Sequence, residues 1–427
     1  MDIKSLHKIF LKSGGVCTDS RKIKNNEIFF ALSGDNFDGN QFAKMAIEQG
    51  AGYAVISDVK YKLTEKYILV PDVLECLQKL ANFHRKSLTT PIIAITGTNG
   101  KTTTKELISR VLQKKFKVAF TQGNLNNHIG VPLTLLSFNK ETEIGVVEMG
   151  ANHIREIAAL CEIAMPDYGI INNIGKAHLE GFGSFEGVIE AKSELYNYCR
   201  INGKKIFVNG DDELLVGLSN GMDRILYGKL AENDVRASFI YADPLLSLEW
   251  KNHKIDTQLV GEYNFHNVLA AITVGDYFSV PEAQICQAIS EYTPQNNRSQ
   301  LTKTKSNTLI IDAYNANPSS MELSIRNFAK INFDNKLPVL GDMFELGSNS
   351  IQEHQKIIEL VKSLEFKNAI FVGKAFYSFS FENYLNFDFF QSTNELSEYL
   401  KINKIKNHTI LLKASRGVQL EKVLNYL

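Results

Sequence analysis

Short apolar runs alternate with amphipathic stretches along most of this chain. Residues 92–96 form an apolar run, and residues 101–114 then carry apolar side chains at helical spacing. Apolar strands joined by crossover helices are typical of parallel sheets that are covered on both faces. The pattern predicts strands at 27–32, 54–56, 92–96, 116–120, 143–149, 168–174, 204–209, 308–312, 337–341, 368–372 and 409–414, and helices at 41–49, 101–114, 153–164, 186–199, 264–278, 281–292, 319–330, 351–364 and 417–426.

The order of these elements predicts an α/β protein of three domains. They are a small N-terminal α/β domain (1–87), a central P-loop domain with a doubly wound, mostly parallel sheet (88–294), and a C-terminal Rossmann-like α/β domain (295–427).

Two stretches interrupt the alternation. After Asp211 the segments 239–241 and 246–250 predict an antiparallel β excursion within the central domain. The polar stretch 292–297, which contains a proline, predicts a hinge before the third domain.

Composition excludes several classes of protein. The 427 residues carry zero formal net charge, which argues against nucleic acid or an anionic membrane as the main partner. The five cysteines are scattered without a C-x-x-C pair, which indicates a reducing cytoplasm. The N-terminus lacks an apolar signal core, and no apolar run approaches the ~20 residues that span a membrane. We therefore expect a cytoplasmic protein.

A glycine-containing loop between the predicted strand at 92–96 and the following helix is the clearest candidate site. Gly97 and Gly100 allow the backbone to direct its N–H groups toward one point, and the helix adds its positive N-terminal end. Lys101 can reach outer phosphates, and the hydroxyl of Thr102 can bind a magnesium ion. The loop therefore predicts a phosphate-binding site.

This loop differs from the common P-loop, which has a glycine five positions before Gly100, where this chain has Ile95. The alternative interpretation is a strand-to-helix turn that binds nothing. The lysine and threonines in this context favour the phosphate-binding interpretation.

Other candidate residues follow the predicted strands. Glu148 ends an apolar strand, and His178 lies just beyond another. Strand ends of a doubly wound sheet meet at one edge, so both are candidate ligands near the P-loop. Lys192 lies on a predicted helix, and by itself it indicates only a solvated lysine. In the first domain, Ser20 and Arg21 belong to a polar cluster with two interpretations, ordinary turn chemistry or an anion-binding loop.

Several motifs together resemble the Mur ligases, the cytoplasmic amide ligases of peptidoglycan synthesis. They are Gly-Thr-Asn-Gly-Lys-Thr-Thr at 97–103, Val-Glu-Met-Gly-Ala-Asn at 147–152, Ala-His-Leu-Glu-Gly-Phe-Gly-Ser at 177–184 and Ala-Lys-Ser-Glu at 191–194. In the third domain, Asp-Ala-Tyr-Asn-Ala-Asn-Pro-Ser-Ser-Met at 312–321 and Leu-Gly-Asp-Met-Phe-Glu-Leu-Gly at 340–347 resemble the member that adds D-alanyl-D-alanine. The resemblance extends from Thr18 to Gly417.

The resemblance implies an ATP-dependent ligase that joins D-alanyl-D-alanine to UDP-N-acetylmuramoyl-tripeptide through an acyl phosphate. It also implies two Mg²⁺ ions, a carbamylated Lys192 and a monomer. It assigns nucleotide binding to Gly97, Thr98, Asn99, Gly100, Lys101, Thr102, Thr103, Asn264, Asn267, Arg298 and Asp312, metal binding to Thr102, Glu148, His178 and Lys192, substrate binding to Ser20, Arg21, Asn315 and Asn317, and catalysis to Lys101, Lys192 and His178. His128 departs from the acidic residue or asparagine more usual in the family.

Other classes remain to be separated from this hypothesis. A tripeptide-forming Mur ligase or a folylpolyglutamate synthase shares the chemistry, but the third-domain motifs argue against both. A P-loop switch protein would need a guanine-binding Asn-Lys-x-Asp motif, which the chain lacks. A ring motor and a catalytically inactive binding protein are further alternatives. The third residue of the accepted tripeptide, lysine or diaminopimelate, stays open.

Overall fold

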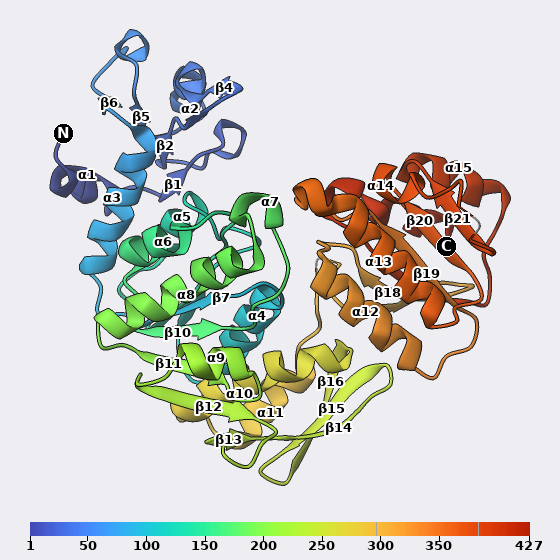
Figure 1. The fold of residues 1–427 in the computed structure, drawn as a ribbon. Helices are drawn as coiled ribbons and strands as arrows, with labels where there is room; N and C mark the ends of the chain where they lie inside the picture. The colour runs from blue at the N-terminus through green and yellow to red at the C-terminus, as the bar shows by residue number, and fades with distance from the viewer. Residues whose placement is uncertain (296, 383) are drawn as a thin grey trace.

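The computed structural model describes residues 1–295, 297–382 and 384–427. Three α/β units follow one another along the chain, with the third unit facing the central one (Figure 1). The predicted fold class, three α/β domains with mostly parallel sheets, is confirmed.

The N-terminal unit is built on a four-stranded parallel sheet with the order β1-β2-β5-β6. The pattern missed its helices α1 (Ile3–Phe10) and α3 (Val73–Lys86), and each begins at an aspartate cap. Asp2 accepts from the N–H of Ser5, and Asp72 accepts from that of Glu75. The elements of this unit are β1 (Val16–Cys17), β2 (Ile28–Phe30), β3 (Ser33–Gly34), β4 (Phe37–Asp38), α2 (Ala43–Glu48), β5 (Tyr53–Ile56) and β6 (Tyr67–Leu69).

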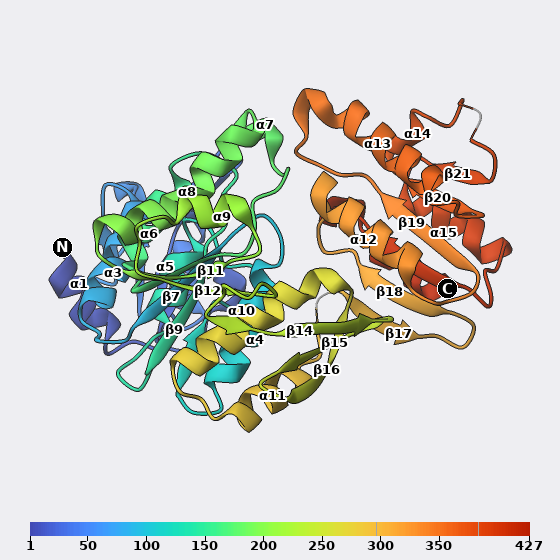
Figure 2. The ribbon, with the colours of Figure 1, turned by 60° about the horizontal axis from the view of Figure 1, so that its bottom comes forward.

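The central unit contains a seven-stranded parallel sheet with the order β13-β12-β11-β10-β7-β9-β8. Strand β7, which lies between β10 and β9, is buried throughout, and the P-loop joins it to α4. Figure 2 shows helices on both faces of this sheet. The elements are β7 (Ile92–Thr96), α4 (Lys101–Leu112), β8 (Val118–Phe120), α5 (Gly130–Leu136), β9 (Ile144–Glu148), α6 (Glu156–Ala164), β10 (Tyr168–Ile171), α7 (Leu179–Phe182), α8 (Phe185–Ile201), β11 (Lys205–Asn209), α9 (Glu213–Leu218), β12 (Arg224–Gly228) and β13 (Val235–Arg236).

The predicted antiparallel excursion is confirmed as a three-stranded sheet. It consists of β14 (Ser238–Ala242), β15 (Leu245–Trp250) and β16 (His253–Val260), and α10 (Phe265–Tyr277) and α11 (Glu282–Glu291) follow it. Leu107 and Val111 of α4 share a hydrophobic core with Leu269 and Val274 of α10. This packing fixes the P-loop helix against α10, and the first turn of α10 also lines the candidate active site.

The third unit has a six-stranded sheet with the order β17-β18-β22-β19-β20-β21, in which β17 is antiparallel to β18. The predicted hinge at 292–297 precedes it and includes Asn296, which lies outside the described residues. The elements are β17 (Gln300–Lys303), β18 (Thr308–Asp312), α12 (Pro318–Lys330), β19 (Lys336–Gly341), α13 (Ser350–Ser363), β20 (Ala369–Val372), α14 (Lys374–Tyr377), β21 (Phe387–Phe390), α15 (Thr393–Ile402) and β22 (Thr409–Lys413).

The predicted helix at 417–426 is wrong in type, because this segment forms 3₁₀ turns at Arg416–Val418 and Leu420–Tyr426. Leu420 and Val423 are buried at a spacing of three residues. That spacing matches the three-residue turn of a 3₁₀ helix. In the part of the chain that is described, no helix combines the length and apolar character needed to cross a membrane.

Two buried histidines join the N-terminal unit to the central one. The rings of His7 on α1 and His84 on α3 are hydrogen-bonded through Nε2 and Nδ1 at 3.0 Å. Nε2 of His84 lies 2.9 Å from the carbonyl oxygen of Phe138 in the central unit. Burial lowers the pKa of His84, and burial together with the neighbouring His84 lowers the pKa of His7.

Acidification is expected to destabilise the protein through these two histidines. Their folded pKa values lie below the unfolded value of 6.5, so the unfolded state binds protons first as the pH falls below 6.5. The free energy of unfolding should therefore decrease from about pH 6.5 downward. Thermal midpoints at about pH 7.5 and about pH 5.5 measure this, and His7→Asn should reduce the difference. The same substitution at the exposed His253 should leave the difference as in the wild type.

Candidate active site

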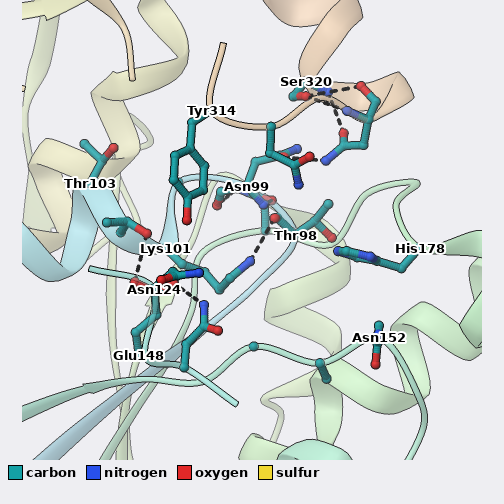
Figure 3. Close-up of a pocket in the computed structure, with 18 of the residues that line it drawn as sticks. Thr98, Asn99, Lys101, Thr103, Asn124, Glu148, Asn152, His178, Tyr314 and Ser320 are labelled. Atoms are coloured by element: carbon teal, nitrogen blue, oxygen red, sulfur yellow. Dashed lines mark hydrogen bonds between the residues drawn. The ribbon is translucent and has the colours of Figure 1, made fainter. Parts of the chain in front are cut away.

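A cavity of about 750 Å³ lies between the central and third units. We call it the interdomain cavity. Figure 3 shows Tyr314 and Ser320 entering it from the third unit, opposite Glu148 and Asn152 of the central unit. Fourteen of the predicted site residues line it: Thr98, Asn99, Gly100, Lys101, Thr102, Thr103, Glu148, His178, Asn264, Asn267, Arg298, Asp312, Asn315 and Asn317.

The shape of the P-loop depends on its glycines. Gly100 has a φ of 78°, and a Cβ atom there would lie 2.5 Å from Oδ1 of Asn267. The left-handed conformation turns the chain directly into α4, which begins at Lys101. Nζ of Lys101 donates to the carbonyl oxygens of Gly97 at 2.7 Å and Thr98 at 3.0 Å. Burial lowers the pKa of Lys101, and its Nζ stays within the loop whose N–H groups could bind the phosphates of a nucleotide.

The carboxylate of Glu148, at the end of the neighbouring strand β9, faces the P-loop. Oε2 of Glu148 accepts from the hydroxyl of Thr102 at 2.9 Å, and Oε1 accepts from Nδ2 of Asn126 at 2.7 Å. The register pairs Ile95 of β7 with Glu148 of β9, so both strands end at the same level. A hydroxyl beside a carboxylate is an oxygen donor set of the kind that Mg²⁺ prefers, and the residues present therefore fit this ion.

Asparagines after β10 and on α10 form hydrogen bonds with the P-loop and with the first turn of α4. The N–H of Asn99 donates to Oδ1 of Asn173 at 2.9 Å. Nδ2 of Asn172 donates to the hydroxyl of Thr104 at 2.8 Å, and that hydroxyl donates to Oδ1 of Asn267 at 3.1 Å. Asn172 and Asn173 were not predicted as site residues, although two adjacent asparagines directly after an apolar strand were a signal for such a role.

The third unit contributes charged and aromatic groups. Nζ of Lys413 donates to Oδ2 of Asp312 at 2.6 Å, and the two residues are paired in the register of β18 and β22. The guanidinium of Arg298 lies 3.6 Å from the centre of the Tyr314 ring. Nδ2 of Asn317 donates to Oδ1 of Asn99 at 2.8 Å, which is a direct contact with the P-loop. Tyr314 was missed as a site residue, although it stands in the 312–321 motif.

His178 contacts a carboxylate of the third unit. Its Nδ1 pairs with Oε2 of Glu345, and the N–H of Glu180 donates to the carbonyl oxygen of Glu345 at 3.3 Å. Both His178 and Glu345 have a left-handed backbone, with φ of 51° and 61°. Such strain in residues other than glycine concentrates at functional sites. The hydrogen bond from His178 lowers the pKa of Glu345.

Lys192 is buried, contrary to the solvated position that its sequence pattern indicates. It is 2% exposed on α8, and its Nζ donates to the carbonyl oxygen of Ala151 at 3.3 Å. Its ammonium lies 5.3 Å from the centre of the Phe182 ring. Burial, followed by the charge of Lys101, lowers the pKa of Lys192 to about 7. A large fraction of the amine is therefore neutral near neutral pH.

Some predicted residues lie outside the interdomain cavity. Gly97 and Lys192 are adjacent to residues that line it without lining it themselves. Ser20 and Arg21 lie in the N-terminal unit, where Asp19 pairs with the exposed guanidinium of Arg21 at 2.8 Å. Among the described residues, no group of three His, Cys, Asp or Glu side chains could hold a metal ion. A metal ion here would thus need the hydroxyl of Thr102 or oxygen atoms of a nucleotide as further ligands.

Comparison with known proteins matches all three units to one family. Residues 13–85 match the catalytic domain of the Mur ligase family, residues 95–275 the Mur ligase middle domain, and residues 297–416 the Mur ligase, glutamate ligase domain.

Individual relatives align with nearly the whole length of this chain. UDP-N-acetylmuramoyl-tripeptide–D-alanyl-D-alanine ligase of Bacillus subtilis is 34% identical over 422 residues, which cover 96% of this chain and 92% of the relative. A crystal structure of MurF from Acinetobacter baumannii superposes with a TM-score of 0.85 at 28% identity, covering 96% of this chain and 92% of the other. MurF ligase from Thermotoga maritima in complex with ADP gives a TM-score of 0.84 at 25% identity, covering 98% and 97%. With three matching domains in the same order, this chain belongs to the Mur ligase family.

Proposed function

We propose that this protein is the cytoplasmic, ATP-dependent ligase that joins D-alanyl-D-alanine to UDP-N-acetylmuramoyl-tripeptide and forms the UDP-muramoyl-pentapeptide precursor of peptidoglycan. One observation carries the proposal. The P-loop with Lys101, and the pair Thr102 and Glu148, face the 312–317 segment of the third unit across a single cavity. A nucleotide on one wall and an acceptor on the other would meet there. The relative from B. subtilis with the corresponding name supports the choice of substrates.

The first step needs positive charge around the transferred phosphoryl group. The carboxylate that ends the tripeptide attacks the γ-phosphate of ATP, which gives an acyl phosphate and ADP. Lys101 and the N–H groups at the start of α4 stabilise the charge on the γ-phosphate. Bound magnesium ions would neutralise further phosphate charge, and Thr102 and Glu148 would be ligands of these ions. Asn264, Asn267 and Asp312 are our candidates for contacts with adenine and ribose, and Arg298 for a contact with phosphate.

The second step needs a site that excludes water. The free amine of D-alanyl-D-alanine attacks the acyl carbon and loses one proton, and the tetrahedral intermediate releases phosphate to give the amide. An acyl phosphate hydrolyses in water, so contacts between the domains protect it. The contacts from Asn317 to Asn99 and from Glu345 to His178 span the interdomain cavity. Asn315 and Asn317 are our candidates for binding the dipeptide.

We also propose that Lys192 is carbamylated and helps His178 and Glu148 to bind a second magnesium ion. The neutral amine attacks carbon dioxide and loses one proton, which leaves a carbamate anion. Burial favours this reaction because it lowers the pKa of the amine to about 7. In the N-terminal unit, we propose that Ser20 and Arg21 bind the uridine diphosphate end of the tripeptide substrate. A monomer remains our prediction.

Phosphate release from ATP tests the reaction. The purified protein is supplied with Mg²⁺ and UDP-muramoyl-tripeptide, with D-alanyl-D-alanine present or absent. We expect phosphate only in the complete mixture, together with a mass gain of one dipeptide on the nucleotide substrate. Phosphate release without either substrate would instead indicate a switch or motor protein. Turnover only with a folate or another amino acid would keep the ligase chemistry and overturn the substrate.

Lys101→Ala should lower kcat by ~10²–10³-fold, because it removes a preorganised cation from the transferring phosphoryl group. The fold should persist, and circular dichroism and the thermal midpoint check this. Lys140→Ala removes an exposed lysine and should retain wild-type turnover. Turnover of Lys101→Ala within about twofold of the wild type would contradict the assignment of this site.

Lys192→Ala should be slow and should be partly rescued by short-chain carboxylates such as acetate. The added carboxylate would replace the carbamate as an oxygen ligand. Steady-state turnover against acetate concentration measures the rescue. The matched control is Lys101→Ala, which removes a cation and should gain nothing from acetate. Unimpaired activity of Lys192→Ala would exclude the carbamate.

A further inference from the structure

A second lysine of the P-loop helix has no part in the chemistry proposed above. Lys105 lies one turn after Lys101 on α4, and it is 1% exposed without lining the interdomain cavity. A buried ammonium is strongly unfavourable unless it is paired or hydrogen-bonded. Its contacts therefore show what the lysine does.

The short contact of Lys105 is to a carbonyl group and not to an acid. Its Nζ donates to the carbonyl oxygen of Thr121 at 2.8 Å, whereas Oε1 of Glu106 lies 3.7 Å away. The other carboxylate oxygen of Glu106 accepts from the hydroxyl of Tyr292 at 2.5 Å. Because Glu106 is engaged elsewhere, the hydrogen bond to Thr121 is the main polar contact of Lys105 among the described residues.

Thr121 in turn holds Glu148. The side-chain hydroxyl of Thr121 accepts from the backbone N–H of Glu148 at 2.9 Å. The N–H of Thr121 donates to the carbonyl oxygen of Val146 at 3.0 Å, so Thr121 continues the pairing of β8 with β9. Thr121 is fully buried and Glu148 is 1% exposed, so water does not compete for these bonds.

We infer that Lys105 is a positioning residue for the carboxylate of Glu148, acting through Thr121. Lys105 fixes the carbonyl group of Thr121, Thr121 fixes the backbone of Glu148, and the side chain of Glu148 then faces Thr102. An apolar residue could fill the space of the lysine stem but could not donate to the carbonyl. The inference rests on the proposed magnesium site. It does not depend on which amine the ligase joins to its nucleotide substrate.

Metal binding tests this inference without relying on turnover. Mn²⁺, a probe for Mg²⁺, is titrated into the protein–ADP complex, and free Mn²⁺ is measured by electron paramagnetic resonance. Lys105→Met should weaken Mn²⁺ binding by ~10-fold or more, which is the usual effect of removing a partner behind a metal ligand. ADP affinity without metal, measured by calorimetry, should stay within about threefold of the wild type because the P-loop is unchanged.

Two further variants make the result decisive. Thr121→Val keeps the carbonyl group that Lys105 contacts and removes the hydroxyl that accepts from Glu148, so it should weaken Mn²⁺ binding in the same direction. Lys114→Met removes a lysine just beyond the same helix, where Nζ contacts Oε2 of Glu291 at 3.1 Å, and should bind Mn²⁺ as the wild type does. If Lys105→Met does not fold, Lys105→Gln takes its place, because its side chain is too short to reach the carbonyl group of Thr121 and should weaken Mn²⁺ binding in the same direction.

Each outcome has one meaning. Wild-type Mn²⁺ affinity in Lys105→Met, or in Thr121→Val, would overturn the inference. Equal weakening in Lys114→Met would also overturn it, because the effect would then belong to any lysine of this region. Failure of the wild-type protein–ADP complex to bind Mn²⁺ would instead overturn the proposed magnesium site.

Discussion

The candidate active site depends on one hydrogen bond, in which the hydroxyl of Thr102 on the P-loop helix donates to the carboxylate of Glu148. Thr102 stands on the helix that follows β7, and Glu148 ends the adjacent strand β9. Parallel pairing places both groups at one edge of the sheet, because parallel strands end on the same side. The asparagines behind the loop and the buried Thr121 support the two sides of this contact.

The central unit supplies only one wall of the interdomain cavity. Asp312, Tyr314 and Asn317 come from the third unit, and Asn317 contacts the P-loop directly. The left-handed pair His178 and Glu345 forms a second contact between the units. Because both units line the cavity, a movement of the third unit would change the groups that surround phosphates bound at the P-loop. That coupling suits a reaction whose intermediate must be kept from water.

Sequence patterns located much of the fold because its strands are continuous apolar runs. The predictions at 92–96 and 308–312 coincide with β7 and β18. The helices α1 and α3 were missed although each begins at an aspartate cap. The last segment was predicted as a helix but forms 3₁₀ turns, in which residues 420 and 423 are buried in the third unit at a three-residue spacing.

The P-loop, the order of strands and helices, and the resemblance to the Mur ligases could all be read from the residues in order, because these features depend on local spacing and residue type. The burial of particular polar residues, and the contacts between them, became clear from the folded chain. Lys192 has the sequence pattern of a solvated helix lysine, yet it lies in the interior, and so does Lys105. Their partners Ala151 and Thr121 come from other elements. Desolvation and hydrogen bonding depend on neighbours that are distant along the chain, so packing alone gives these lysines their properties.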